Sequence, residues 1–375
     1  MFYRKNIAIF AALILKGTPM ELEIVKIAAD KKKNKPNFDT SLGFGKYFSD
    51  HFFTMKYDAK SGWHHPKIEP YRPLMLDPAA MVLHYAQEIF EGLKAYHSKN
   101  GIFLFRAKDN LIRMNNSARR LCMPEIDVDF VHDAMKKLVL VDQEWIPTAR
   151  ETSMYIRPTM IATEASVGVR VSSEYLFYII VGPAGSYYPE GFNPIKIFVS
   201  DKYVRAVRGG VGEAKTGANY AASLYAAQEA KKMGYSQVLW LDAIDQKYVE
   251  EVGTTNIFFR FEDEVVTSPL TGTILPGITR DSVIKLLKSW NIKCNERRIS
   301  IDEIMEGSKS GKLKEVFGTG TAAVISPVSE LHYKEQNFKI GNGKIGDISL
   351  KLYNEILSIQ YGEKDDPFGW VEKIG

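Results

Sequence analysis

The feature that most constrains this chain is the segment from Arg208 to Tyr220, with the sequence RGGVGEAKTGANY. Its lysine, Lys215, lies between tight glycine turns just ahead of a predicted helix, and glycines in such a place usually accompany a bound ligand because they let the backbone approach it. No Gly-Lys-Ser/Thr closes the segment, and its glycine spacing differs from a dinucleotide fingerprint. The segment is therefore neither a Walker loop nor a Rossmann turn. Since most lysines lie on the surface, Lys215 gains meaning only from the motifs that follow it.

Three further motifs follow along the chain. The first, Glu250–Asn256 (EEVGTTN), is a turn signal before a strand, with a carboxylate where the chain should bend. The second, Leu275–Arg280 (LPGITR), opens a helix, whose free N–H groups are a ready phosphate site. The third, Gly318–Ala323 (GTGTAA), consists of small residues whose backbone can approach a ligand.

The first half of the chain is expected to alternate strands with helices. Asp77 and Pro78 predict the start of a helix that carries Met81, Tyr85 and Ile89 at four-residue spacing. The other predicted elements are a hairpin at Asn100-Gly101, helices near 108–122 and 129–142, strands at 153–163 and 174–181, and a linker at 182–191 that is rich in turn-forming residues.

The second half is expected to open with a strand at 195–199. A helix over about 217–233 repeats Tyr220, Leu224, Ala227 and Ala230 on one face, which predicts that this face is core. Strands at 238–241, 256–261 and 264–267, a helix at 278–290, and a helix capped by Ser300 with Glu303 complete the prediction.

Length and composition favour a globular protein of two domains. The 375 residues exceed one ordinary domain, so we expect an interdomain cleft, and 45% apolar with 25% charged residues excludes disordered and fibrous classes. With a net charge of +4, and a basic run at Lys31–Lys35 that is expected to be a solvated loop, no nucleic-acid partner is expected.

Two further features bear on the compartment. Cys122 and Cys294 have neither metal-ligand nor disulfide spacing, so we expect no metal site and a reducing, cytoplasmic setting. The apolar run Ile7–Leu15 is too short to span a membrane, and an upstream start codon or loosely attached leader is favoured over export.

The four motifs, in this order, together with Phe90-Glu91-Gly92 and Tyr155-Ile156-Arg157-Pro158, resemble the branched-chain aminotransferases of the fold-type IV pyridoxal-phosphate enzymes. The resemblance runs from about residue 38 to near the end of the chain. It implies a mixed α/β (α+β) fold of two domains with the cofactor, pyridoxal 5′-phosphate, in the cleft between them. The expected parts are a partly flexible N-terminal extension (1–37), a smaller domain (38–181), a linker (182–193) and a larger cofactor-binding domain (194–375).

The resemblance assigns cofactor residues. Lys215 is similar to the lysine that bonds to the cofactor and moves the proton at the substrate Cα. Glu251 matches the acid that holds a proton on the pyridine nitrogen, and Tyr220 matches the tyrosine that binds the phenolic oxygen, although core packing is its alternative. The remaining assignments are phosphate ligands: Arg113, Thr254, Ile278, Thr279 and Thr321, of which Arg113 has a surface position as its ordinary alternative.

The resemblance also assigns substrate residues. Phe90, Tyr155 and Tyr187 look like the pocket for the branched side chain, and Thr321-Ala322 looks like the backbone donor pair for the carboxylate. Tyr85 resembles a residue that reaches across a homodimer interface into the partner's site. Arg157 either assists there or forms a salt bridge at a strand end.

The implied reaction transfers an amino group between leucine, isoleucine or valine and 2-oxoglutarate, which gives glutamate by ping-pong kinetics, with no membrane or nucleic-acid partner. Rivals in the same fold are a D-amino-acid transaminase and an aminodeoxychorismate lyase. A phosphate-ligand binding protein without chemistry is the rival from another class, but it would be expected to lack Lys215 or Glu251.

Overall fold

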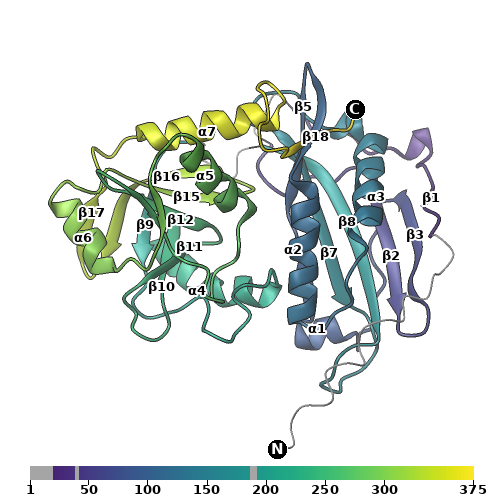
Figure 1. Cartoon of the computed structure of the whole chain (residues 1–375). Coiled ribbons are helices and arrows are strands. Elements are labelled where there is room, and N and C mark those ends of the chain that lie inside the picture. The colour runs from purple at the N-terminus through teal and green to yellow at the C-terminus, as the bar shows by residue number, and fades with distance from the viewer. Residues whose placement is uncertain (1–19, 39–41, 186–191) are drawn as a thin grey trace, which may run out of the picture.

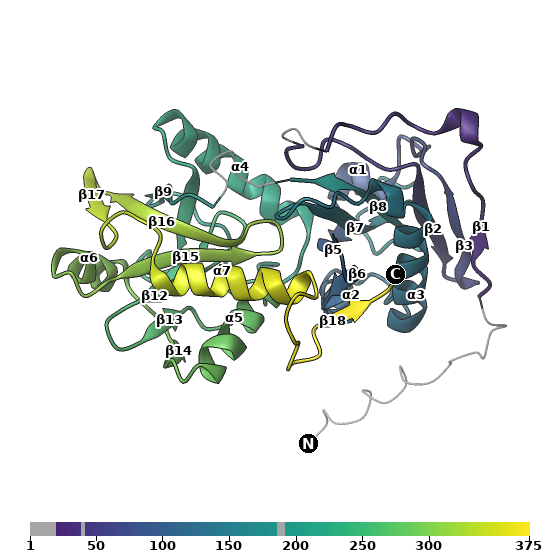
Figure 2. The same cartoon turned by 90° about the horizontal axis from the view of Figure 1, so that it is seen from above.

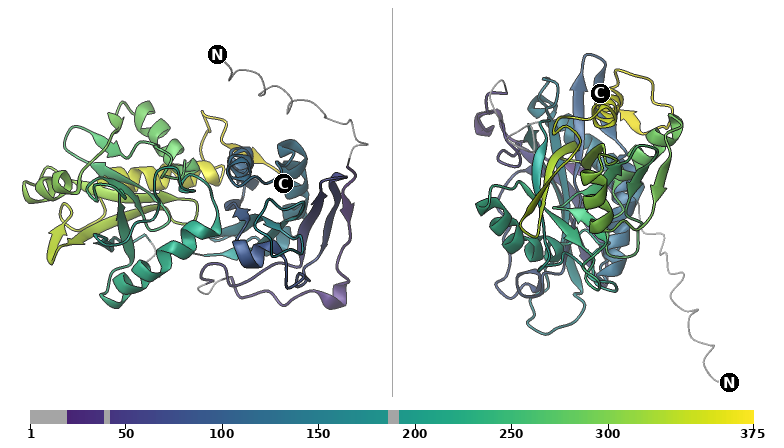
Figure 3. Two further views of the ribbon diagram at one scale, coloured as in Figure 1. Left: turned by 90° about the horizontal axis from the view of Figure 1, so that it is seen from below. Right: turned by 90° about the vertical axis from the view of Figure 1, so that its left-hand side faces the viewer.

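The structure, a computed structural model, describes residues 20–38, 42–185 and 192–375. It contains two nine-stranded sheets, each packed with helices, in two lobes that lie side by side (Figures 1 and 3). The predicted mixed α/β fold class is therefore confirmed.

The first sheet forms the lobe that contains most of the N-terminal half. Antiparallel pairing dominates it, and β7 and β8 form its longest ladder. Its strands, in spatial order, are β1 (Glu23–Ile24), β3 (Gly62–Pro70), β2 (His51–Asp58), β8 (Glu174–Ala184), β7 (Ser153–Ala162), β5 (Leu93–Ser98), β6 (Gly101–Phe105) and β18 (Val371–Lys373), with β4 (Glu88–Phe90) paired to β7.

The two predicted helices, α2 (Ala107–Arg120) and α3 (Val128–Val141), are confirmed. They pack on this sheet over a core of buried hydrophobic side chains. Figure 1 shows α2 at the boundary between the lobes. The hairpin at Asn100-Gly101 is also confirmed. The prediction for α1 (Met81–Tyr85) is wrong at both ends: its N-cap is Ala80, and Ala86 in the left-handed conformation ends it. Ile89 therefore lies on strand β4.

The second sheet forms the other lobe. It differs from the prediction at Glu251, which lies on a strand and not at a bend. Its strands, in spatial order, are β11 (Val249–Val252), β10 (Gln237–Leu241), β9 (Ile195–Val199), β16 (Val324–Tyr333), β15 (Glu315–Gly320), β12 (Asn256–Arg260), β13 (Val265–Thr267) and β14 (Cys294–Glu296), with β17 (Gln336–Lys339) paired to β16.

Helices α4 (Gly217–Lys232), α5 (Ile278–Ser289), α6 (Ile301–Lys309) and α7 (Asp347–Gln360) pack around this sheet. The predicted cap of α6 is confirmed, because Ser300 accepts a hydrogen bond from the Glu303 N–H at 3.1 Å. The predicted core face of α4 is confirmed at Ala230 but wrong at Leu224, which is 67% exposed; the buried positions are Asn219, Ser223, Ala226 and Ala230. Among the helices of the described ranges, none is long and apolar enough to cross a membrane.

The chain crosses between the lobes more than once. Strand β8 continues to Ala184, inside the segment predicted as linker, and residues 186–191 of that segment lie outside the described residues. After α7 the chain returns to the first lobe, where β18 pairs with β6 (Figure 2). One apolar cluster joins Tyr96 and Phe105 of the first sheet to side chains of α5 and α7.

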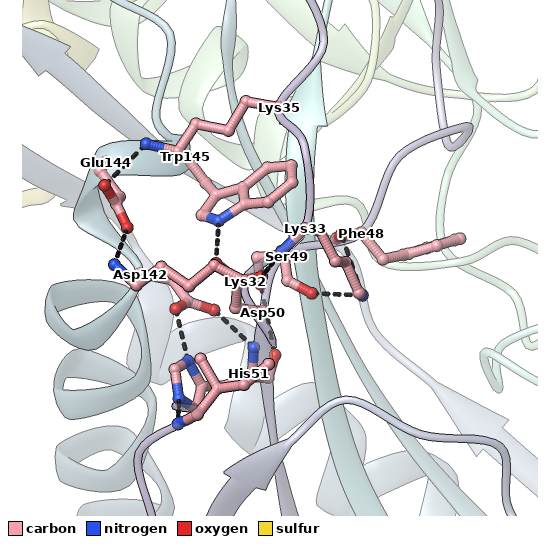
Figure 4. A network of polar contacts seen from close by, with 11 residues as sticks. Lys32, Lys33, Lys35, Phe48, Ser49, Asp50, His51, Asp142, Glu144 and Trp145 are labelled. Atoms are coloured by element: carbon pink, nitrogen blue, oxygen red, sulfur yellow. Dashed lines mark hydrogen bonds and ion pairs between the residues drawn. The ribbon is translucent and has the colours of Figure 1, made fainter. Parts of the chain in front are cut away.

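The segment before β2 is bound to the first lobe by polar contacts (Figure 4). Lys32 and Lys35 each lie 2.7 Å from the Glu144 carboxylate, and Lys33 donates to the Ser49 carbonyl at 2.6 Å. The basic run that the sequence predicts as a solvated loop is thus mostly exposed but attached at three of its lysines. At the start of β2, His51 pairs with Asp142 at 2.6 Å.

Candidate active site

The backbone of Lys215 is bonded to the first lobe. Its N–H donates to Ser117 Oγ on α2 at 2.9 Å, and its carbonyl accepts the N–H of Phe90 at 3.0 Å. The glycines are needed here: Gly209 has φ +80°, and a Cβ on Gly212 would lie 2.4 Å from the Thr273 carbonyl oxygen. The backbone of the loop therefore fixes where the lysine side chain begins.

The side chain of Lys215 points into a cavity of about 480 Å³. Its amine donates to the Tyr220 hydroxyl at 2.9 Å and lies 5.1 Å from the centre of the Phe90 ring. The cavity brings together twelve of the residues singled out from the sequence: Phe90, Arg113, Tyr155, Arg157, Lys215, Tyr220, Glu251, Thr254, Ile278, Thr279, Thr321 and Ala322.

Glu251 lies on β11 and is 2% exposed. Its Oε1 accepts from Asn256 Nδ2 at 3.0 Å, and Arg205 Nη1 lies 2.6 Å from its Oε2. Because Arg205 directs its N–H groups at the carbonyls of Gly212 and Thr273, Oε2 is close to the positive charge yet accepts no well-directed hydrogen bond. Burial raises the pKa of Glu251 to about 7, and Arg205 partly opposes this shift.

The start of α5 forms another part of the cavity. Its N-cap, Gly277, offers no side-chain cap, so the first N–H groups, including those of Ile278 and Thr279, are free of one. A Cβ on Gly277 would lie 2.0 Å from Asn256 Oδ1, so a side chain there would displace the amide that binds Glu251. Thr319 Oγ1 on β15 is buried without a hydrogen-bond partner in the described structure. We call Glu251, Thr254, Ile278, Thr279 and Thr319 the polar wall.

Arg113 borders the same end of the cavity. The alternative of a surface position is wrong, because the side chain is buried. Its guanidinium makes a bidentate pair with Glu91 at 2.8 and 2.7 Å and donates to the Pro276 carbonyl at 3.1 Å. It therefore joins α2 to the turn that precedes α5.

The rest of the cavity is built from aromatic rings. The Arg157 guanidinium lies 4.7 Å from the Phe90 ring centre and donates to the Tyr155 hydroxyl at 3.0 Å. Phe44 packs edge-on against Tyr155, with ring centres 4.6 Å apart. Among the described residues Arg157 forms no ion pair within 4.0 Å, so its alternative role as a strand-end salt bridge is not observed. We call Phe44, Phe90, Tyr155 and Arg157 the aromatic wall.

One predicted substrate residue, Tyr85, does not line this cavity. Tyr85 is 38% exposed and donates to the Val167 carbonyl. Tyr187 lies outside the described residues.

Sequence reasoning missed several residues. Asn256 and Thr319 stood inside quoted motifs, and their polar side chains next to Glu251 and Thr321 were a usable signal. Phe44 lies in a Gly-Phe-Gly turn, which signals only a bend. Arg205 has no local signal, because only the fold brings it to Glu251.

The comparisons with known proteins agree with this geometry. The family described as Amino-transferase class IV matches residues 88–331. The chain belongs to the class IV aminotransferases. Branched-chain-amino-acid aminotransferase 2 of Bacillus subtilis is 51% identical to it over 358 residues, which cover 95% of this chain and 98% of that protein.

The fold of this class IV aminotransferase is similar to that of solved branched-chain amino acid aminotransferases. The branched-chain amino acid aminotransferase from Escherichia coli aligns with a TM-score of 0.71 at 26% identity, covering 87% of this chain and 99% of its own. The branched-chain amino acid aminotransferase from Thermobaculum terrenum, solved in its PLP form, aligns with a TM-score of 0.70, covering 86% of this chain and 98% of its own. At 22% identity this second likeness bears on the fold alone.

Proposed function

We propose that this class IV aminotransferase transfers the amino group of leucine, isoleucine or valine to 2-oxoglutarate, with pyridoxal 5′-phosphate held at Lys215. The observation that carries the proposal is one cavity in which the Lys215 amine and the Glu251 carboxylate meet a set of aromatic rings. Relatives about half identical over most of the chain, which bear the name of branched-chain aminotransferases, support it.

The residues of the cavity fit this cofactor. When bound, pyridoxal phosphate supplies a ring that accepts the electron pair of the substrate's Cα–H bond. Glu251 Oε2, buried and without a well-directed hydrogen bond, is suited to hold a proton on the ring nitrogen. The start of α5, the Thr254 hydroxyl and the unpartnered Thr319 Oγ1 offer donors to a phosphate, next to the Arg113 charge.

Lys215 and Tyr220 would divide the proton chemistry. The Lys215 amine is the group that can remove and return the proton at the substrate Cα, since it is a primary amine at the end of a flexible chain in the cavity. The Tyr220 hydroxyl, 2.9 Å from that amine, orients it and offers a hydrogen bond to the cofactor's phenolic oxygen.

Substrate selection would come from the aromatic wall. Phe90 and Tyr155, with Phe44 behind them, offer apolar surface to a branched side chain. The N–H groups of Thr321 and Ala322 would bind the α-carboxylate. Tyr187 would complete the pocket, and Tyr85, exposed in one chain, would contribute to the site of a partner in a homodimer.

We also propose domain boundaries at residues 38, 182 and 194. A cytoplasmic location is proposed as well. The return of β18 to the first sheet means that the segment 194–375 contributes one strand to the smaller domain.

The proposed function is tested by absorbance spectroscopy of the purified holoenzyme. Leucine should shift the cofactor band and 2-oxoglutarate should restore it, and Lys215→Ala should abolish this cycle. A band that responds only to D-alanine or to aminodeoxychorismate would be consistent with the family assignment but would overturn the substrate assignment. The absence of any cofactor band would overturn the proposal as a whole.

A further inference from the structure

A second buried lysine lies next to the cavity. Lys94 on β5 is 6% exposed, and its amine donates to the carbonyl oxygen of Ala322 at 2.8 Å. This bond joins positions 228 residues apart and connects the first sheet to the loop between β15 and β16.

The charge of Lys94 has no acidic partner. Among the described residues, no carboxylate lies within 4.0 Å of its amine, and burial alone lowers the pKa of this lysine to about 8. The amine is still protonated at neutral pH. A buried ammonium without a counterion is costly for the fold. A negatively charged group of a bound ligand nearby would offset part of this cost.

The position of Lys94 relates it to the substrate end of the cavity. It is the register partner of Tyr155 on β7, so the two side chains stand on the same face of the sheet. Ala322 lines the main cavity and also a smaller one of about 40 Å³ that Lys94 lines. The Thr321–Ala322 turn therefore stands between the Lys94 amine and the main cavity.

We propose that Lys94 is a positioning residue that holds the Thr321–Ala322 turn from behind and places a positive charge near the substrate's α-carboxylate. The bond to the Ala322 carbonyl fixes the position of this turn, and both of its residues line the main cavity. The charge adds an attraction that is weakly screened because the site is buried. The inference rests on the proposed function, because that function identifies the molecule with the α-carboxylate as a branched-chain amino acid.

Binding separates this role from a structural one. In the holoenzyme, the dissociation constants of 4-methylvaleric acid and of its amide are measured by calorimetry for the wild type and Lys94→Met. We expect the variant to weaken binding of the acid about tenfold, since a positive charge near the carboxylate and the anchor of the turn are both lost, and that of the amide less than about twofold. KM for leucine should rise by a similar factor while kcat changes less than about threefold.

Equal weakening of acid and amide, or no weakening of either, would overturn the inference. Lys99→Met, which removes an exposed lysine from the end of the same hairpin, is the matched control and should change neither constant. If Lys94→Met does not yield folded holoenzyme, the same ratio is measured on Lys94→Gln, which keeps a donor without the charge, and an unchanged ratio overturns the inference. Failure of the wild type to convert leucine would instead overturn the proposed function. The ratio of the two dissociation constants tests only the role of Lys94, because it is measured without turnover.

Discussion

The two walls of the cavity differ in chemistry and in origin. The polar wall comes from the second lobe and combines a buried carboxylate, a helix start and an unpartnered hydroxyl. The aromatic wall comes from the first lobe and combines rings with one guanidinium. Lys215 lies between them, with its backbone bonded to α2 and to Phe90. The difference indicates that reaction chemistry and side-chain selection are divided between the lobes, so substitutions in the two walls should affect different kinetic constants.

The largest kinetic effect within the walls is expected at Glu251. Glu251→Gln removes the carboxylate that would keep the ring nitrogen protonated, so kcat with leucine should fall about 100-fold or more while KM changes little. Stopped-flow measurement of the leucine half-reaction checks this. Glu250→Gln is the matched control, because Glu250 accepts from Thr273 and does not line the cavity. A kcat within a few-fold of wild type for Glu251→Gln would contradict the division between walls.

The next effect concerns stability of the polar wall. Arg205→Met leaves Glu251 buried without its cation, which should lower the free energy of unfolding by about 3 kcal/mol. Urea denaturation of the cofactor-free protein measures it. Lys32→Met, which breaks an exposed pair with Glu144, should move the midpoint far less. Equal shifts for both variants would show that burial of the pair is unimportant.

A smaller effect is expected in the aromatic wall. Tyr155→Phe removes the acceptor for Arg157, and kcat/KM for leucine should fall about tenfold through KM, since a partly buried guanidinium loses a hydrogen bond. Steady-state kinetics with leucine and with glutamate check it. Tyr235→Phe, in the second lobe, serves as the control. A fall in kcat instead of a rise in KM would show that Tyr155 acts in the reaction itself. It would contradict the assignment of side-chain selection to the aromatic wall.

The smallest effect is a pH dependence of stability. The pKa of Glu251 is raised from 4.5 to about 7, so the folded protein keeps this proton after the unfolded chain has lost it. Its contribution therefore destabilises the fold as pH rises from about 5 to about 7. The melting temperature of the cofactor-free wild type, relative to Glu251→Gln, should fall over this range. A difference that stays constant or rises would contradict the shift.

Much of the fold could be predicted because it depends on local signals, whereas the site residues were assigned through the resemblance of the ordered motifs to a family. Caps, turns and alternating runs gave helices α2, α3 and α5 and strands β7 to β10. The errors arose where distant contacts decide. On α4, helical spacing fits several faces, and packing selects the one with Ala226 and Ala230. Arg205 and Lys94 act through partners that only the tertiary fold brings near them.

The central claim, that Lys215 holds the cofactor, is tested most directly by trapping the linkage. The purified holoenzyme is reduced with borohydride and digested, and its peptides are mapped by mass spectrometry. We predict a phosphopyridoxyl group on the peptide that contains Lys215, and its loss when leucine is added before reduction. A label on another lysine, such as the buried Lys94, or no label at all would contradict the account.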